Sequence, residues 1–404
     1  MKPRLHFHSD AEFFAGCENM LVNFFADESL RREYRISFSY QRSEAYDAGL
    51  RWRVPELPEL FALELPDADV WAGRLPSLLR PIFKLLARLF ALRVWLALWN
   101  AWRLERLFRE LSPQVLHINN GNWPGGYTCQ AAALAAQRAK VPAVVYVVNN
   151  MAIGYGWRRW AERSLDRAVA AAVDRFVVAS RAPALRLREI LSLPAESVSI
   201  LPNGIAPRPH EETREQTRRR LGLPEQRVVA ASIALLERRK GHALLLRALA
   251  RLERRPLLVI EGEGPEKSNL EALLEELGLS SDVRFIGRER NIFDLLGAAD
   301  ILVESSLGFS PAPNIVAEAM SQGLAVLASV HSSSEQLEDG RTGLLVDPSD
   351  TSALAAALAS LERDPALRRR LGEAAARAFA EKFAAGPAVE RYRALYSSLR
   401  RPDW

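Results

Sequence analysis

The sequence predicts an α/β protein built from two doubly wound domains that face a cleft. Short β-branched and aliphatic runs alternate with helical patterns along nearly the whole chain, which indicates βαβ units around parallel sheets. The length of 404 residues exceeds what one hydrophobic core usually organises. Pro207 and Pro209 interrupt the alternation near the middle of the chain, so we expect two domains that are joined there.

The expected domain boundaries follow from these breaks. The segment 205–212 is the predicted linker, and Gly386-Pro387 separates a last helix from the helix before it. We therefore predict an N-terminal domain, a C-terminal domain and a final helix that packs back on the N-terminal domain. Their ranges are 1–206, 207–386 and 387–404.

Seven strands are expected in the N-terminal half, because each is a short apolar run bounded by polar or turn residues. They are 4–8, 35–39, 61–65, 115–118, 143–148, 175–178 and 198–201. Helical periodicity fills the gaps between several of them. The clearest helical patterns are 18–25, 128–139 and 158–172.

The C-terminal half repeats the alternation with five strands and then ends in alanine-rich helices. The expected strands are 228–233, 257–260, 283–286, 301–303 and 325–328. The expected helices are 243–252, 351–361, 366–383 and 388–399.

Composition and charge restrict the classes of function. The net charge of +5 comes mostly from arginine and favours an anionic ligand or surface, but no zinc-finger spacing or aromatic RNA-binding signature indicates nucleic acid. Two cysteines, Cys17 and Cys129, and a polar start without a secretory signal predict a reduced, cytoplasmic setting. We expect no metal site, because the six histidines lack metal-ligand spacing and the Asp67-Ala68-Asp69 segment is typical of a solvated loop.

Three adjacent cations stand between a strand and a helix in the C-terminal half. Arg238, Arg239 and Lys240 precede the helix 243–252, whose dipole repels positive side chains unless an anion is also present. The amides of a helix start and a lysine together can hold phosphate. This pattern predicts a phosphate site with Lys240 at its centre, although such a cluster is also typical of a solvated loop.

Further loop motifs lie at strand ends in the same half. Asn203-Gly204 tolerates a left-handed backbone, so it predicts a tight turn and, as an alternative, a ligand contact. Gly262-Glu263-Gly264 is a strand-to-helix turn rather than a dinucleotide fingerprint, because Lys267 replaces the third glycine. Glu318 is surrounded by apolar neighbours on the helix that Asn314 opens, so its carboxylate is expected to meet a polar ligand.

The segment 78–111 is rich in Leu, Trp and Arg. Arg80, Lys84 and Arg88 stand four residues apart and share one helical face, with apolar residues on the other. Arg93 and Asn100 interrupt the apolar run, which disfavours a membrane-spanning helix. Two interpretations remain open, namely an amphipathic helix at a membrane interface and a core-facing helix pair of the N-terminal domain.

These motifs together resemble the GT-B glycosyltransferases, specifically the retaining group called glycosyltransferase family 4. Six segments of the C-terminal half are similar to that family in its order. They are ILPNGI, RRKGHALLLRAL, LLVIEGEGPEKSNLEALLEELGL, VRFIGRERNIFDLLGAADILV, NIVAEAMSQGLAVLAS and EQLEDGRTGLLVDPSD. The N-terminal half resembles the family less extensively. Its similar segments are AGCEN, VLHINNGNWPGG and VPAVVYVVNNMA.

The resemblance implies a GT-B fold of two Rossmann-like domains, with a nucleotide-sugar donor on the C-terminal domain and an acceptor on the N-terminal domain. By it, Lys240 neutralises the diphosphate and Glu318 holds the ribose, so neither a metal nor a cofactor is needed. The residues assigned to catalysis are Lys240, Arg239, Asn149 and Asn150. Those assigned to the donor are Gly16, Asn203, Arg238, Gly287, Arg288, Ser310, Asn314, Ile315 and Glu318. Those assigned to the acceptor are Asn119, Asn120 and Trp123.

Three positions depart from the family pattern. Leu235 stands where the family usually has a phosphate-binding arginine, and Ser310 stands where it has the first carboxylate of its Glu pair. The strand end that often carries a histidine is Val148-Asn149-Asn150 here, and an amide there is no general base near neutral pH.

We therefore expect a cytoplasmic retaining transferase, at the inner face of the membrane if 78–111 is interfacial. It would move a sugar from a UDP- or GDP-sugar to a glycan or lipid-linked acceptor during the assembly of cell-surface polysaccharide. The departures leave two alternatives, an inactive nucleotide- or glycan-binding partner subunit and a nucleotide-sugar epimerase of the same fold.

Overall fold

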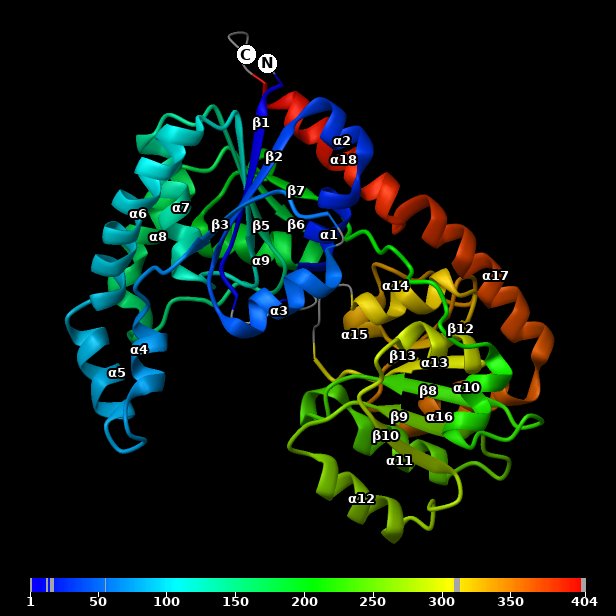
Figure 1. Ribbon diagram of the computed structural model, residues 1–404. Helices are drawn as coiled ribbons and strands as arrows, with labels where there is room; N and C mark the ends of the chain where they lie inside the picture. The colour runs from blue at the N-terminus through cyan, green and yellow to red at the C-terminus, as the bar shows by residue number, and fades with distance from the viewer. Residues whose placement is uncertain (1, 12–13, 15–17, 55, 309–312, 401–404) are drawn as a thin grey trace. The chain divides into compact units, whose positions relative to one another are not determined.

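The computed structural model describes residues 2–11, 14, 18–54, 56–308 and 313–400 (Figure 1). The chain forms two compact units. The first comprises Met1–Pro202 and Ala388–Trp404, and the second comprises Asn203–Pro387. The chain passes from the first unit to the second after Pro202, a few residues before the boundary that we expected after residue 206.

The first unit contains a parallel seven-stranded sheet in the order β3-β2-β1-β4-β5-β6-β7. This order reverses direction between β1 and β4, which is the topological switch point of a doubly wound sheet. The strands are β1 (Arg4–Ser9), β2 (Arg35–Gln41), β3 (Glu59–Leu63), β4 (Val115–Asn120), β5 (Ala143–Val148), β6 (Arg175–Val178) and β7 (Val198–Ile200).

Two helical layers cover this sheet, and each has its own hydrophobic core. One layer packs its apolar side chains with Leu116 and Ile118 of β4, and the other packs with Leu5 and Phe7 of β1. The first layer consists of α6 (Leu92–Leu111), α7 (Tyr127–Arg138), α8 (Arg163–Ala171) and α9 (Arg181–Leu191). The second consists of α1 (Asn19–Ala26), α2 (Glu28–Glu33), α3 (Glu44–Arg53) and α18 (Ala385–Ser398). The remaining helices are α4 (Ala68–Arg74), α5 (Arg80–Leu89), η2 (Trp157–Glu162) and η3 (Ala195–Ser197).

The last helix, α18, completes the second core of the first unit. Tyr392 and Tyr396 are buried there, and the Tyr396 hydroxyl shares a hydrogen bond of 2.7 Å with Nδ1 of His117 on β4. The ring of Phe24 on α1 packs edge-on against Tyr392. The C-terminal segment thus supplies core side chains to the unit that begins at the N-terminus.

The second unit contains a parallel six-stranded sheet in the order β10-β9-β8-β11-β12-β13, with its switch point between β8 and β11. Its strands are β8 (Val229–Ile233), β9 (Leu257–Glu261), β10 (Val283–Gly287), β11 (Ile301–Glu304), β12 (Ala325–Ser329) and β13 (Leu344–Val346). Its helices are α10 (Arg214–Leu221), η4 (Arg238–Lys240), α11 (His242–Ala250), α12 (Lys267–Glu276), α13 (Ile292–Ala298), α14 (Asn314–Ser321), α15 (Val330–Ser333), α16 (Thr351–Arg363) and α17 (Pro365–Lys382).

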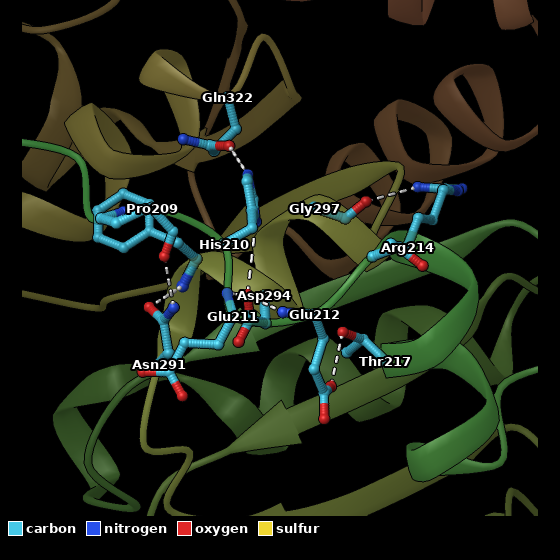
Figure 2. A network of polar contacts seen from close by, with 12 residues as sticks. Pro209, His210, Glu211, Glu212, Arg214, Thr217, Asn291, Asp294, Gly297 and Gln322 are labelled. Atoms are coloured by element: carbon cyan, nitrogen blue, oxygen red, sulfur yellow. Dashed lines mark hydrogen bonds and ion pairs between the residues drawn. The ribbon is translucent and has the colours of Figure 1, made fainter.

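The segment 205–212, which we expected to be a linker, is bound to the second unit. Ile205 pairs with Ala384 through a backbone bridge, with Ile205 N donating to the Phe383 carbonyl at 2.8 Å. Figure 2 shows the next contacts, in which Oδ1 of Asp294 accepts hydrogen bonds from the backbone N–H groups of Glu211 and Glu212. These bonds satisfy the backbone of a proline-containing segment, so it is ordered without being helix or strand.

Candidate functional site

The carboxyl ends of the strands are where doubly wound sheets bind ligands, and in the second unit the loops at this edge are tied together. Oγ of Ser305, after β11, donates a hydrogen bond of 2.9 Å to the Lys240 carbonyl, after β8. Leu307 N donates to the Arg239 carbonyl at 2.8 Å. Gly241 has φ +73°, and a Cβ there would lie 1.9 Å from Ser305 O, so only glycine permits this approach. Lys240 is thereby held at the switch point.

The glycine-rich turn after β9 braces the same loop. Leu236 N donates to the Glu263 carbonyl at 2.9 Å, and a Cβ on Gly262 would lie 2.0 Å from Ala234 O. A Cβ on Gly264 would lie 2.4 Å from Leu236 O. The glycines therefore let two backbones pack closely, as expected of a tight strand-to-helix turn.

Lys240 supplies a positive charge at the switch point of the second sheet. Burial lowers the pKa of its half-buried ammonium, and the nearby Glu304 carboxylate opposes that shift. His242 is buried at the start of α11, and burial together with Lys240 lowers its pKa to about 4. His242 is therefore neutral near pH 7, and neither of its ring nitrogens has a hydrogen-bond partner within the described residues.

The flanking arginines differ from Lys240 in exposure. Arg238 and Arg239 are both exposed, and Nε of Arg239 forms an ion pair of 2.5 Å with Glu237. Leu235, which stands at the family's arginine position, is also exposed. The lysine is thus the cation of this cluster that the fold holds against the sheet.

Glu304 is a site residue that the sequence analysis missed. It ends β11 and is buried, with Oε1 accepting a hydrogen bond of 3.2 Å from Ser306 N. Its Oε2 accepts from the Ser332 hydroxyl on α15. The sequence feature that could have identified Glu304 is its place directly after the apolar run Ile301–Val303, at a strand end. Glu304 places a negative charge beside Lys240 and orders the loop after β11.

The helix α14 carries three of the assigned donor residues. Asn314 and Ile315 form its first turn, and Glu318 lies half-buried between buried neighbours. Gln336 Nε2 donates to the Pro313 carbonyl at 3.2 Å, which fixes the helix start. The expectation of a buried helix around Glu318 is confirmed by the burial of its neighbours, which are Val316, Ala317, Ala319 and Met320.

The other assigned donor residues, apart from Gly16, belong to the same unit. Gly287 ends β10 with φ +71°, and its carbonyl accepts from Gly262 N at 2.8 Å. Arg288 is exposed after it, and Asn203 is half-buried after β7. Gly16 and Ser310 lie outside the described residues.

In the first unit, two of the assigned asparagines meet at the carboxyl ends of β4 and β5. Asn149 Nδ2 donates to Oδ1 of Asn119 at 3.0 Å and to the Asn120 carbonyl at 2.9 Å. Both side chains are buried, whereas Asn150 is exposed. The pair orients the strand ends, and Asn150 is the amide that faces solvent.

The side-chain amide of Asn120, which was assigned to the acceptor, is engaged within the first unit. Its Nδ2 donates to the Asn122 carbonyl and to the Tyr146 hydroxyl, each at 2.8 Å. Its Oδ1 accepts from Gly126 N at 3.0 Å. With both ends of the amide engaged and the side chain buried, it shapes the turn before α7.

Trp123, which was also assigned to the acceptor, has a side chain that is 0% exposed. Its indole Nε1 donates to Oδ2 of Asp166 at 3.1 Å. The same buried carboxylate accepts from the Tyr155 hydroxyl at 2.8 Å and forms an ion pair of 2.7 Å with Arg159. Trp123 therefore anchors the loop after β4 to α8 from inside the core.

Potential metal ligands do not gather in the described part of the chain, where no group of three His, Cys, Asp or Glu side chains could hold an ion. The Asp67–Asp69 segment has a local role instead. Oδ1 of Asp67 accepts the backbone N–H groups of Asp69 and Val70 and caps the start of α4.

Comparison with known families identifies both halves of the chain. Residues 213–378 match the family described as glycosyl transferases group 1, and residues 41–204 match the glycosyl transferase 4-like domain. The first range falls within the second structural unit, and the second range covers most of the first unit. Together they account for most of the chain.

Curated relatives have polysaccharide-related and other glycosyltransferase names. The chain is 33% identical over 177 residues to the lipopolysaccharide core biosynthesis glycosyltransferase LpsD of Rhizobium meliloti, a match that covers 44% of this chain and 51% of LpsD. It is 29% identical over 395 residues to the D-inositol 3-phosphate glycosyltransferase of Streptomyces avermitilis, covering 87% and 84% of the two chains. The chain thus spans about half the length of LpsD and most of the second relative.

Solved structures share the fold at low sequence identity. Anabaena Alr3699/HepE, crystallised with UDP, superposes with a TM-score of 0.76 at 17% identity, over 98% of this chain and 100% of that one. A glycosyltransferase from Rickettsia africae gives a TM-score of 0.78 at 14% identity, over 99% of each chain. Taken with the two family matches and the two parallel doubly wound sheets, these similarities show that the chain has the GT-B fold and belongs to the group 1 glycosyltransferases.

Proposed function

We propose that this chain is a retaining glycosyltransferase that moves a sugar from a UDP- or GDP-sugar to a glycan or lipid-linked acceptor. The donor binds to the second unit and the acceptor to the first. The setting is the assembly of cell-surface polysaccharide at the cytoplasmic face of a membrane. The lipopolysaccharide name of LpsD and the UDP in the Anabaena crystals support this proposal.

The observation that carries the proposal is the position of Lys240. Hydrogen bonds from Ser305 and Leu307 hold its loop at the switch point of the second sheet, next to the start of α11. A half-buried ammonium and the amides of a helix start are suited to a diphosphate, whose negative charge grows as the bond to the sugar breaks. The site supplies this electrostatic stabilisation from its own residues, so the reaction runs without a metal ion.

Roles for the other residues come from the family resemblance, and their places in the fold are compatible with them. The carboxylate of Glu318, half-buried on α14, accepts hydrogen bonds from the ribose hydroxyls, and Arg288 lies beside the base. In the first unit, Asn150 is exposed after β5 and can hydrogen-bond the transferred sugar or the acceptor. The retaining outcome rests on the family resemblance of the C-terminal half.

A panel of nucleotide sugars tests this function. The full chain should release UDP or GDP from one donor, and that release should continue in the presence of EDTA. NMR of the product should show the same anomeric configuration as the donor. Stabilisation by a donor without any turnover would replace the proposal with an inactive binding subunit. Conversion of the donor to its epimer without acceptor would replace it with an epimerase.

We also propose that α5 contacts an anionic membrane. The two interpretations of the segment 78–111 apply to different helices. Ala97, Ala101, Leu104 and Phe108 of α6 are buried against the first unit's core, so α6 is a core helix. By contrast, most of the apolar side chains of α5 and its flanks are exposed, although Ala87 is buried. The exposed ones are Leu78, Leu79, Ile82, Leu85, Leu86, Leu89 and Phe90.

The charge of this apolar surface indicates the kind of membrane. Arg80, Lys84 and Arg88 stand among the exposed apolar side chains on α5. Three tryptophans on the outer side of α6, Trp95, Trp99 and Trp102, are exposed as well. Basic and aromatic side chains beside an apolar face are typical of helices that lie in the interface of anionic lipid. No helix of the described residues is long and apolar enough to span a bilayer.

A further inference from the structure

The first unit contains a cavity of about 900 Å³ that none of the assigned acceptor residues lines. It lies beyond the carboxyl ends of β1, β2 and β3, where Asp10, Arg42 and Glu64 follow those strands. This is the edge of a doubly wound sheet at which ligands bind. We call this cavity, between the three strand ends and α4, the Asp10 pocket.

The Asp10 pocket is lined by an aromatic ring and by charged side chains, which are the kinds of groups that bind sugars. Trp71 of α4 lines the Asp10 pocket and is 38% exposed, so part of its indole is available to a ligand. The apolar faces of a sugar ring pack on such a flat aromatic surface, while its hydroxyls need polar partners at the edge. Carboxylates and guanidinium groups of Asp10, Glu64, Asp67 and Arg103 stand around the same space.

Asp10 is held in the lining of the pocket by a hydrogen bond from α7. Its Oδ2 accepts a hydrogen bond of 3.0 Å from Thr128 N, in the first turn of that helix. A Cβ on Gly126 would lie 2.6 Å from the same oxygen, so glycine makes room for the carboxylate. Burial raises the pKa of Asp10 to about 6, which reflects a carboxyl group withdrawn from bulk water.

Two of the arginines that line the pocket, Arg42 and Arg103, are only partly engaged by the protein. Arg103 donates from Nη1 to the Glu64 carbonyl at 3.0 Å. Arg42 approaches Asp47 at 3.5 Å and Glu64 at 3.7 Å, which are long separations for charge-assisted hydrogen bonds. Each guanidinium group has five N–H donors, so both retain donors for ligand hydroxyls.

We propose that the Asp10 pocket holds the terminal sugar of the acceptor, with Trp71 packed against its ring and Asp10 accepting a hydrogen bond from one of its hydroxyls. This inference rests on the proposed function, because it names the acceptor subsite of the same enzyme. It replaces Asn120 and Trp123, whose side chains are internally bonded or buried, with residues that a ligand can reach.

Saturation-transfer NMR of the full chain with methyl glycosides of glucose, galactose and mannose tests the pocket. At least one of them should receive signal from the wild-type protein. Trp71→Ala should weaken its binding by roughly tenfold, because an exposed stacking surface is lost. Asp10→Asn, which keeps an oxygen for Thr128 N, should also reduce the signal. Trp99→Ala is the matched control, since Trp99 is an exposed tryptophan of α6 outside the pocket.

Octyl glycosides of the same sugars distinguish a lipid-linked acceptor from a free glycan. A lipid-linked acceptor should make the octyl form bind more tightly than the methyl form, whereas equal binding of both indicates a free glycan end. Binding of either form must depend on Trp71. No signal from any glycoside with the wild-type protein, or equal signals from wild type and Trp71→Ala, would overturn the pocket.

A separate readout keeps this test independent of the proposed function. Hydrolysis of the donor by water, measured as nucleoside diphosphate release by the wild-type protein without acceptor, reports on the donor site alone. If the proposed function is wrong, no variant releases nucleoside diphosphate, yet glycoside binding still depends on Trp71. If only the pocket is wrong, donor hydrolysis and transfer both survive the substitution of Trp71.

Discussion

The hydroxyl of Ser305 donates a hydrogen bond of 2.9 Å to the carbonyl oxygen of Lys240 and so joins the loops that follow β8 and β11. These two strands flank the switch point of the second sheet. The bond fixes the backbone of the lysine while its ammonium group stays half-buried beside Glu304. The cation is thus pre-positioned for the diphosphate of the proposed donor.

Replacing Lys240 should therefore affect turnover more than donor binding. Loss of a contact that strengthens in the transition state typically costs about 2.7–4 kcal/mol, so Lys240→Ala should lower kcat by roughly a hundredfold to a thousandfold. Steady-state kinetics and donor titration measure the two effects. Lys267→Ala is the control, because Lys267 is exposed on α12. Full activity of a folded Lys240→Ala variant would place the diphosphate elsewhere.

Glu318→Gln should affect donor binding more than turnover. The substitution keeps the shape of the side chain but removes its charge, so a ribose contact weakens in the ground state and transition state alike. The donor KM should rise while kcat changes little. Glu275→Gln, an exposed substitution on α12, should leave both constants unchanged. A fall in kcat at constant KM would show that Glu318 acts on the chemical step instead.

Gly241→Ala tests the close approach of the two loops. The new Cβ would meet Ser305 O at 1.9 Å on a backbone with φ +73°, so the loops must separate. Donor binding should be lost and the melting temperature should fall. Gly278→Ala has a similar φ of +65° with nothing within 4 Å of its Cβ, so it isolates the strain of the backbone conformation alone. Equal effects of the two substitutions would mean that the loop contact has no special importance.

The buried histidines His6, His8, His117 and His242 should make the protein sensitive to acid, because burial lowers the pKa of each ring. Burial lowers the pKa of His8 to about 4, of His117 to about 3 and of His242 to about 4. Their folded-state pKa values lie below the ordinary value of 6.5, so the stability they contribute is fully present above pH 6.5 and is lost as the pH falls towards 4. A tenfold change in a protonation equilibrium corresponds to about 1.4 kcal/mol of free energy, so the combined loss of stability is large.

Thermal melting between pH 7 and pH 4 measures this loss. His117→Gln removes one titrating ring and should reduce the dependence on pH, whereas His331→Gln, at an exposed position, should not. Asp10 acts in the other direction, because its raised pKa of about 6 gives stability that is present at low pH and is lost as the pH rises through 6. A melting temperature that stays constant down to pH 4 would contradict the assignment of neutral buried histidines.

The protein should bind anionic vesicles through α5 and sediment with them. Binding should be clear at low salt, weak to neutral vesicles, and reduced by salt, because each basic residue near the surface contributes about 1 kcal/mol. The double substitution Leu85→Gln and Leu89→Gln should abolish it. Leu185→Gln is the control, since Leu185 is 64% exposed on α9 rather than on α5. Binding that survives the loss of both leucines would remove the membrane role of α5.

The alternation of apolar runs and helical patterns was sufficient to predict the two doubly wound sheets. Such patterns are local, because a buried parallel strand must be apolar along most of its length whatever lies around it. All twelve expected strands are present, with shifts of a residue or two at their ends. The missed strand, β13 (Leu344–Val346), is three residues long and half-buried.

Which polar residues face a ligand was decided only by the tertiary structure. Trp123 and Asn120 lie at a strand end as acceptor residues should, yet partners distant in the sequence bury them, and Asp166 lies 43 residues from Trp123. The segment 78–111 has the pattern of one amphipathic stretch, but packing buries α6 and leaves α5 exposed. Asp10 and Glu304 became visible as site residues through neighbours on other elements. Local sequence determines the strands and turns, whereas burial and partnership of a polar side chain depend on what the fold brings against it.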